Sequence, residues 1–408
     1  KMTVKNYLPF YLIGLYPVAL ILGTLISEIL TLFLITLYIS DCIKDKKKFI
    51  FNDPIIYFLI LIWFYLLFNL FLSIDFQLSL MRSIFFVRYP LLILAITHFL
   101  IKSPEKSQII FTLWIYALTI IIIDLYIQFF FGKNILGYES PWDQRLSGFF
   151  NQELKVAHLL IGFFLPAFSF FFQKQKRNIF LYIALISYFI ILILTNERSN
   201  IIKGTLILII FGMMAPYFKI KIKILFSMIF LGIFSLMIFF IQPLKVRFVD
   251  ELSTMEVDNS LINYVILSNY GPHYLSSIEI FKNNKIFGTG IKTFRIACND
   301  ISIKKYYPND DHRSKSGCST HPHQTYFEIL SDLGLTGFII FSSFFLYLSV
   351  RIVKTFMVTK DLLLLSCGAF YIVQLIPLLP TGSFFTSFGS TIFFINVSLI
   401  YYSFKKYE

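Results

Sequence analysis

The sequence is poor in charged residues. Only 14% of its 408 residues are Asp, Glu, Lys or Arg, whereas 57% are hydrophobic. A soluble globular domain carries about a quarter charged residues, so this composition excludes an ordinary soluble enzyme and indicates an integral membrane protein. The apolar runs are long and lack the alternation of β-barrel strands, which indicates an all-α polytopic fold. We expect one integral membrane domain over residues 1–408.

The signatures of several other function classes are absent. The sequence has no glycine-rich phosphate loop and no Ser-His-Asp order, and Gly288-Thr-Gly290 lacks a Rossmann setting, so we interpret it as a turn. The formal charge is +13, but cytoplasmic loops of membrane proteins collect Lys and Arg for topological reasons. No platform of basic and aromatic residues for single strands is present. We therefore expect no nucleic-acid partner.

The apolar runs predict about twelve membrane-spanning helices, each near the ~20 residues that cross the hydrocarbon. Basic clusters occupy every second connection and both termini, which places both termini in the cytoplasm by the positive-inside rule. The predicted spans are 8–23, 24–41, 54–73, 84–101, 108–131, 154–173, 178–195, 201–217, 222–241, 325–350, 361–379 and 384–403. One extended polar segment, residues 242–324, then lies on the outer, periplasmic face between the ninth and tenth spans. It is too long for a passive connector, and we expect it to carry part of the active site.

Cysteine is scarce, and two of the four cysteines share the predicted outer loop. Cys42 and Cys367 lie in or beside spans, whereas Cys298 and Cys318 both lie in residues 242–324. In an oxidising compartment this pair predicts a disulfide, which would stabilise the fold by about 3 kcal/mol in the chain-entropy model. Two free thiols are the alternative.

Two histidines, His321 and His323, stand where the outer loop runs into the next predicted helix. Imidazole is the side chain whose unperturbed pKa lies near neutrality, so a pair at this junction is compatible with acid/base catalysis. A turn shaped by Pro322 at the start of the helix is compatible with the same spacing. Because His312 is near in sequence, a zinc site is a further alternative.

Arginines recur near the outer ends of the predicted spans, at Arg82, Arg88, Arg145 and Arg198. Arginine at the rim of a helix bundle is unfavourable unless it is paired or contacts water or a ligand. Its bidentate fork suits phosphate oxygens better than lysine does. These residues therefore predict an outward pocket for an anionic head group, such as a diphosphate. Structural ion pairs, for example between Arg198 and Glu197, are the alternative.

One longer pattern points to a family. His323-Gln324, nine further residues and then Gly334-Leu-Thr-Gly337 resemble the His-(Asn/Ser/Gln)-x9-Gly-x-x-Gly motif of bacterial O-antigen ligases, whose membrane superfamily includes O-antigen polymerases. Three other stretches are similar to that superfamily: Arg145-Leu-Ser-Gly148, Asn196-Glu-Arg-Ser199 and Gly288-Thr-Gly290 with the following Phe294-Arg295. The resemblance is strongest over residues 190–345, and residues 1–130 match only in hydropathy.

The resemblance implies a metal-independent, inverting glycosyltransferase of the GT-C-like membrane class, without a cofactor, in the bacterial inner membrane. The donor would be a glycan linked to undecaprenyl diphosphate, and the acceptor a sugar hydroxyl of lipid A–core. His323 would be the general base at the periplasmic face. Arg198 would bind the diphosphate and stabilise its charge as it leaves, and Arg145 and Arg295 would be further donor-binding residues. The remaining substrate-binding candidates are Arg82, Arg88, His321 and Gln324, with His321 supporting the turn.

Two other functions remain open. An O-antigen polymerase, which joins lipid-linked repeat units, would use the same arginines and outer loop, although the motif spacing favours a ligase. A transporter of lipid-linked glycan would place ionisable residues near the midplane of broken helices. Asp124 is the main isolated acid deep in a predicted span, and the other polar groups gather at the outer rim, which disfavours transport.

Overall fold

The computed structural model describes residues 7–45, 53–140, 145–174, 179–217, 219–250 and 261–408. Parts of the predicted cytoplasmic lysine clusters, and residues 251–260 of the outer loop, lie outside the described residues. The longer helices are α3 (Thr24–Lys44), α4 (Pro54–Leu70), α6 (Arg88–Lys102), α7 (Ser107–Phe131), α8 (Val156–Lys174), α9 (Ile179–Leu194), α10 (Arg198–Met214), α11 (Ile220–Phe240), α18 (Thr325–Thr359), α19 (Leu362–Gln374) and α20 (Ser387–Tyr407). The shorter helices are α1 (Leu8–Gly14), α2 (Tyr16–Leu22), α5 (Phe76–Ile84), α12 (Gln242–Lys245), α14 (Leu261–Leu267), α15 (Gly271–Asn283), α16 (Phe294–Ala297) and α17 (Asp311–Lys315).

The predicted all-helical fold is confirmed for the residues that the structure describes, and the helix lengths agree with a multi-pass membrane protein. Among the described residues, 7 helices are long and apolar enough to cross a membrane, and α4, α9 and α19 are shorter apolar helices. Every predicted span contains a helix, although the number of spans stays a prediction. The range 8–23 differs from a single span because it is divided into α1 and α2 near Leu15. Pro17 explains this break, since it has no backbone N–H to continue the hydrogen-bond ladder of α1.

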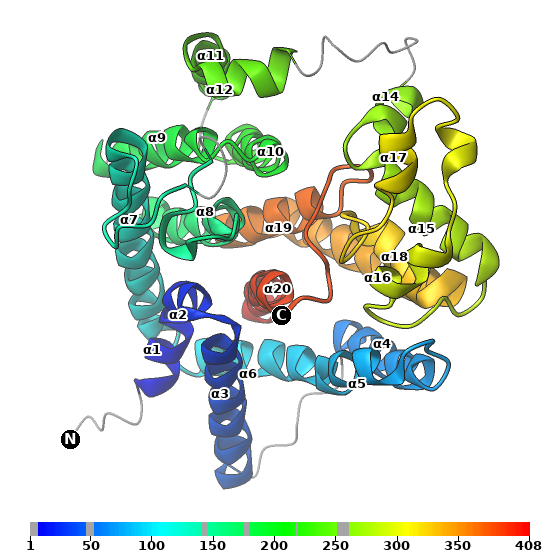
Figure 1. Ribbon diagram of the computed structural model, residues 1–408. Coiled ribbons are helices and arrows are strands. Elements are labelled where there is room, and N and C mark those ends of the chain that lie inside the picture. Colours follow the sequence, from blue (N-terminus) through cyan, green and yellow to red (C-terminus); the bar gives the residue numbers. More distant parts are fainter. Residues whose placement is uncertain (1–6, 46–52, 141–144, 175–178, 218, 251–260) are drawn as a thin grey trace.

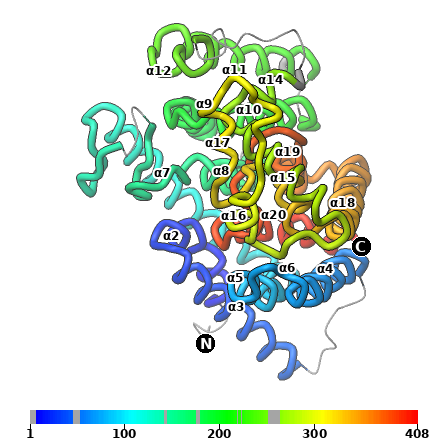
Figure 2. The backbone as a smooth tube through the Cα atoms, turned by 45° about the vertical axis from the view of Figure 1, so that its right-hand side comes forward, coloured from blue at the N-terminus to red at the C-terminus, as the bar shows by residue number. Residues whose placement is uncertain are grey.

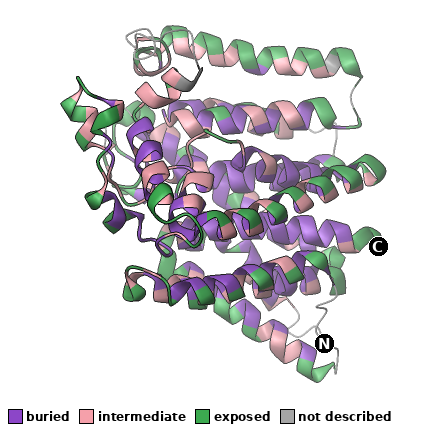
Figure 3. Cartoon of the chain, turned by 90° about the vertical axis from the view of Figure 1, so that its right-hand side faces the viewer, coloured by how far each residue is buried: buried purple, intermediate pink, exposed green. Residues whose placement is uncertain are grey.

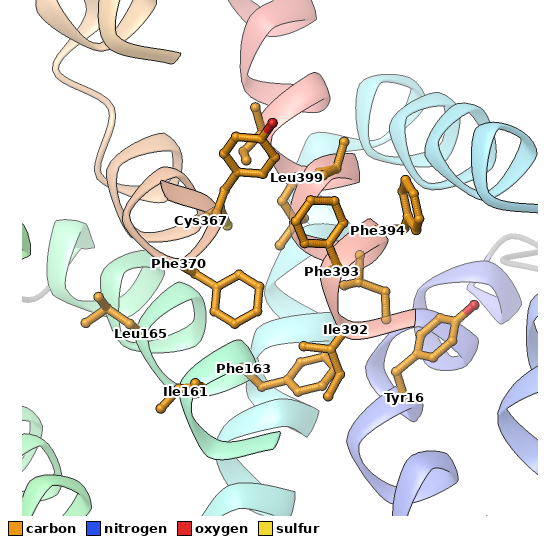
Figure 4. Close-up of a cluster of buried hydrophobic side chains, with 14 of the residues drawn as sticks. Tyr16, Ile161, Phe163, Leu165, Cys367, Phe370, Ile392, Phe393, Phe394 and Leu399 are labelled. Atoms are coloured by element: carbon orange, nitrogen blue, oxygen red, sulfur yellow. The ribbon is translucent and has the colours of Figure 1, made fainter. Parts of the chain in front are cut away.

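Helix α20 forms the centre of the bundle (Figure 1). In the most apolar 18-residue stretch of α20, 94% of the residues are buried, whereas in that of α11, at the periphery, only 6% are buried. Figure 3 shows the same contrast between the buried central helices and the exposed outer ones. Ile392 and Phe393 of α20 lie among Phe163 of α8, Phe370 of α19 and Tyr16 of α2 (Figure 4). The last helix of the chain is therefore held on all sides by helices from distant parts of the sequence.

Ion pairs join several helix ends at one end of the bundle. Asp53, which caps α4, is paired with Arg351 of α18 at 2.9 Å and with Lys405 of α20 at 3.0 Å. Lys406 of α20 is paired with Asp361, the cap of α19, at 3.1 Å. These contacts bring together helix ends that the charge alternation assigns to one face of the membrane. Which face this is remains a prediction from the positive-inside rule.

The short helices of the outer loop lie at the opposite end. Figures 1 and 2 show α14 to α17 grouped together. The loop is bonded to the end of α4 that lies away from Asp53, because the side-chain amide of Asn69 donates to the carbonyl oxygen of Phe287 at 2.6 Å. Helix α15 packs against α18. The loop therefore reaches the start of α18, which directly follows the turn that contains His321 and His323.

Candidate functional site

The backbone around His323 is tightly fixed. His323 has a left-handed conformation, with φ of 58°, and its carbonyl oxygen accepts a hydrogen bond of 2.8 Å from the backbone N–H of Thr381. The next residue, Gln324, caps α18, because its side-chain oxygen accepts from the backbone N–H groups of Tyr326 and Phe327 at 2.7 and 3.2 Å. Asn and Ser, the alternatives at this motif position, are among the preferred N-cap residues. The residue after the histidine thus fixes the start of the helix directly beside His323.

The glycine part of the motif creates a kink inside α18. Gly334 has φ of 67° and ψ of −167°, a conformation essentially restricted to glycine, and an added Cβ would lie 2.5 Å from backbone atoms of Ile286 and Gly288. The break frees backbone groups on both sides for hydrogen bonds with residues 285–290. These hydrogen bonds run from Thr289 N to Ser331 O (3.1 Å), Gly290 N to Asp332 O (2.7 Å), Leu335 N to Lys285 O (2.8 Å) and Thr336 N to Ile286 O (3.1 Å).

The motif therefore joins the outer loop to α18. The histidine and its cap begin the helix, and Gly334 below them packs against the Gly288-Thr-Gly290 turn. The sequence predicts a turn at these residues rather than a dinucleotide-binding loop. Its position against Gly334 agrees with that interpretation.

The predicted disulfide between Cys298 and Cys318 is present, with a Cα–Cα distance of 5.2 Å. Cys298 is buried at the end of α16, and Cys318 stands just before the turn that contains both histidines. The side chain of Ser319 donates to the carbonyl oxygen of His321 at 2.5 Å. The bridge therefore anchors the start of the histidine turn to a packed part of the loop.

A buried polar network holds the α19–α20 connection against the same region. The ammonium group of Lys292 donates to the Ser383 hydroxyl at 2.6 Å, and that hydroxyl donates to a carboxyl oxygen of Glu328 at 2.5 Å. The other Glu328 oxygen accepts from the backbone N–H of Phe384 at 2.7 Å. This network fixes residues 383–384, close to Thr381, which binds the carbonyl of His323.

A cavity of about 990 Å³ lies between the histidine turn, α15, the start of α10 and the α19–α20 connection. It brings together sequence candidates from four separate parts of the chain. The predicted site residues that line it are Arg82, Arg145, Arg198, His321 and His323. Three more candidates do not line it: Arg88, Arg295 and Gln324.

The basic wall of the cavity is built around the start of α10. The guanidinium of Arg198 donates to the backbone carbonyl of Arg247 at 3.0 Å, and that of Arg247 donates to the carbonyl of Asn196 at 3.0 Å. Arg247, in the first part of the outer loop, also lines the cavity. Arg82 lies nearer α20 and donates to the Ser387 hydroxyl at 2.7 Å. With Arg145, these residues place several guanidinium groups around one space.

An acidic side chain shares this wall. Glu197, beside Arg198 in sequence, lines the cavity and accepts a hydrogen bond of 2.7 Å from the side-chain amide of Asn200. Burial raises the pKa of Glu197 to about 7, and the hydrogen bond from Asn200 and the charges of Arg145 and Arg247 oppose that rise. A carboxyl group with this pKa is partly protonated near neutrality, which lessens its repulsion of an anion.

The histidine wall is uncharged near neutral pH. Burial lowers the pKa of His323 to about 4, with a further contribution from nearby His273. Burial, followed by the charge of His323, lowers the pKa of His321 to about 2. The rings of His321 and His323 lie 4.1 Å apart between centroids. His323 is therefore a neutral imidazole in the pH range of a cell and able to accept a proton.

The candidates outside the lining have other surroundings. Arg88 is buried in an ion pair with Glu28, at 2.8 Å, and lies over the ring of Tyr89. Arg295 is exposed on α16, and Gln324 is the helix cap described above. Among the described residues, no group of three His, Cys, Asp or Glu side chains is arranged to hold a metal ion.

Several lining residues were not singled out from the sequence. Arg247 was one basic residue in a loop containing many, although Lys and Arg on the outer face of a membrane protein are a usable signal. Tyr270 and Tyr274 carried no distinguishing pattern. Lys203 lies within a predicted span, is 1% exposed and donates to the side-chain oxygen of Gln374 at 3.1 Å. These residues reach the cavity through packing between distant helices.

Comparison with known proteins agrees with the motif. Residues 181–342 match the family model described as O-antigen ligase. This region contains α10, the outer loop, His321, the motif histidine His323 and both motif glycines. No curated protein matches the chain. The family match confirms the predicted resemblance to the superfamily of O-antigen ligases and O-antigen polymerases over residues 181–342.

Proposed function

We propose that this protein is an O-antigen ligase-type glycosyltransferase of the bacterial inner membrane. It moves a glycan from undecaprenyl diphosphate to a sugar hydroxyl of lipid A–core at the periplasmic face. One observation carries the proposal: His323, Arg145 and Arg198, which lie far apart in sequence, line a single cavity. A neutral base on one wall and guanidinium groups on the other suit a hydroxyl nucleophile and an anionic leaving group.

The proposed reaction begins with the acceptor hydroxyl beside the neutral imidazole of His323. The hydroxyl oxygen attacks the anomeric carbon of the donor from the face opposite the diphosphate, while His323 takes its proton. The bond between the anomeric carbon and the diphosphate oxygen breaks, which inverts the configuration. The imidazolium of His323 then releases its proton to solvent.

The leaving group is the undecaprenyl diphosphate anion. In this scheme Arg198 and Arg145 bind its phosphate oxygens, and Arg247, which is held against Arg198, completes the basic wall. Preorganised cationic donors stabilise charge that develops in the transition state without later rearrangement. Because guanidinium groups supply this charge, the proposed step requires no metal ion.

The test uses a strain lacking this protein, complemented with single variants. We expect His323→Ala and Arg198→Ala each to abolish O-antigen attachment to lipid A–core, while both proteins still insert into the membrane at wild-type levels. His312→Ala is the matched control, because His312 is exposed in the same loop and does not line the cavity. Arg313→Ala is the matched arginine control, because Arg313 lies in the same loop, is paired with Asp310 at 3.0 Å and does not line the cavity. Near-normal attachment by the His323 variant would refute the mechanism.

The same strain separates ligase from polymerase. Loss of all glycan-capped core in the deletion strain indicates a ligase, whereas core capped with single repeat units indicates a polymerase. The polymerase would share the basic wall and the base but would take a second lipid-linked glycan as its acceptor.

A further inference from the structure

The start of α15 forms a second wall beside the proposed base. Tyr270, His273 and Tyr274 line the cavity together with His323. The His323 ring lies 5.3 Å from the ring of Tyr270 and 5.2 Å from that of His273, between centroids. This wall is distinct from the guanidinium groups around Arg198. The cavity therefore offers two chemically different surfaces to a ligand.

Polar groups on this wall lack partners in the protein. Tyr274 is only 3% exposed, and its ring stacks on Phe327 at 4.7 Å between centroids. Within the described part of the chain, the Tyr274 hydroxyl, Nδ1 of His273 and Nε2 of His321 are buried without a hydrogen bond. A buried polar group without a partner is unfavourable. Three such groups beside one cavity indicate that a ligand supplies the missing hydrogen bonds.

The chemistry of this wall selects a neutral polyhydroxylated ligand. Burial lowers the pKa of His273 as it does those of His321 and His323, so the imidazoles are neutral donors and acceptors. A diphosphate would be favoured by the basic wall instead. Tyrosine presents an apolar face together with a polar tip, which matches a sugar ring that has an apolar C–H face and hydroxyls at its edge.

We propose that Tyr270, His273 and Tyr274 form a subsite for the sugar ring of the acceptor, with Tyr270 as the stacking surface and Tyr274 and His273 as hydrogen-bonding groups. The inference rests on the proposed function, since it assigns the acceptor to one wall of that same cavity. A ring held on Tyr270 places a hydroxyl beside His323, which removes its proton. The donor diphosphate then occupies the opposite, basic wall.

The test measures the Michaelis constants of purified protein in nanodiscs for each substrate separately. Donor lipid and uncapped lipid A–core are isolated from the deletion strain. We expect Tyr270→Ala to raise the acceptor KM roughly tenfold, the size of one good contact, with the donor KM unchanged. Tyr270→Phe should keep most of the acceptor affinity, because the stacking surface remains.

Tyr274→Phe separates binding from folding. Removing a buried hydroxyl without a partner should leave the melting temperature unchanged or raise it, yet the acceptor KM should increase. Tyr306→Ala is the matched control, because the Tyr306 hydroxyl is bonded to Glu279 in the same loop at 2.7 Å and does not line the cavity. Wild-type acceptor KM values for both Tyr270→Ala and Tyr274→Phe would overturn the subsite and leave the proposed function standing.

A direct binding measurement distinguishes a failure of the sugar subsite from a failure of the proposed transferase function. Saturation-transfer NMR without donor, with delipidated core oligosaccharide as the probe, should show contact with the wild type and its loss in Tyr270→Ala. If the wild type makes no product but this difference is observed, the transferase proposal fails and the sugar subsite stands. Equal signals from wild type and Tyr270→Ala would overturn the subsite whatever the transfer assay shows.

Discussion

Replacing Gly334 with alanine should detach the outer loop from α18. The native backbone conformation is one that L-residues avoid, at about 1–3 kcal/mol, and the new Cβ would lie 2.5 Å from backbone atoms of Ile286 and Gly288. Backbone atoms cannot rotate away as a side chain can, so residues 285–290 must move. The hydrogen bonds across the kink are then weakened, each contributing about 0.5–1.5 kcal/mol.

Together these effects predict a local loss of at least about 3 kcal/mol, which corresponds to roughly a hundredfold faster amide exchange. The assay is hydrogen–deuterium exchange of the protein in nanodiscs, followed at residues 285–290 and 331–336. Transfer activity should fall in parallel, because the displaced segment leads directly into Lys292, which holds Ser383.

The control is Gly232→Ala in α11. Gly232 has ordinary helical geometry, and an added Cβ would meet nothing within 4 Å. Alanine should be tolerated there or slightly stabilising. Unchanged exchange protection around Thr289 in the Gly334 variant would refute the role assigned to the motif glycines.

Two further predictions concern the disulfide and pH. Reducing the Cys298–Cys318 bridge, or replacing both cysteines with serine, should lower the unfolding free energy by about 3 kcal/mol. In thermal unfolding, reductant should lower the melting temperature of the wild type but not that of the double variant. A wild-type melting temperature that reductant leaves unchanged would count against the bridge. For catalysis, the titration of His323 should leave kcat/KM unchanged between about pH 5.5 and 7.5, and kcat/KM should fall only as the pH approaches the His323 pKa of about 4. A fall in kcat/KM centred near pH 6.5 on the acid side would contradict the burial of the imidazole. At His321 and His323 the unfolded state, with pKa values near 6.5, binds more protons than the folded state, so their contribution to stability should fall as the pH drops below about 6.5. The raised pKa of Glu197 acts in the opposite direction.

Helix positions, the disulfide and the core of the candidate site could be predicted from sequence. Apolar runs of membrane length specify helices locally, since the bilayer requires each span to satisfy its own backbone. The pairing of Cys298 with Cys318 followed from their shared loop. Arg145, Arg198 and His323 were each marked by position at the outer ends of spans, and all line the cavity.

The remaining features depend on long-range packing. Arg88 resembled the other rim arginines in sequence, but its partner is Glu28 on α3. Tyr270 and Tyr274 reach the cavity because α15 packs on α18, and no local pattern marks such a contact. The role of Gly334 likewise depends on its close packing against Gly288, a contact between distant parts of the sequence.

The central claim is that His323 removes the proton from the acceptor during glycan transfer. The most direct test compares wild type and His323→Ala in nanodiscs, measuring donor affinity and single-turnover transfer to lipid A–core in the same preparation. We predict unchanged donor affinity with transfer reduced by about 10²–10⁴, the usual contribution of a positioned base. Transfer by the variant at a rate close to that of the wild type would contradict the account.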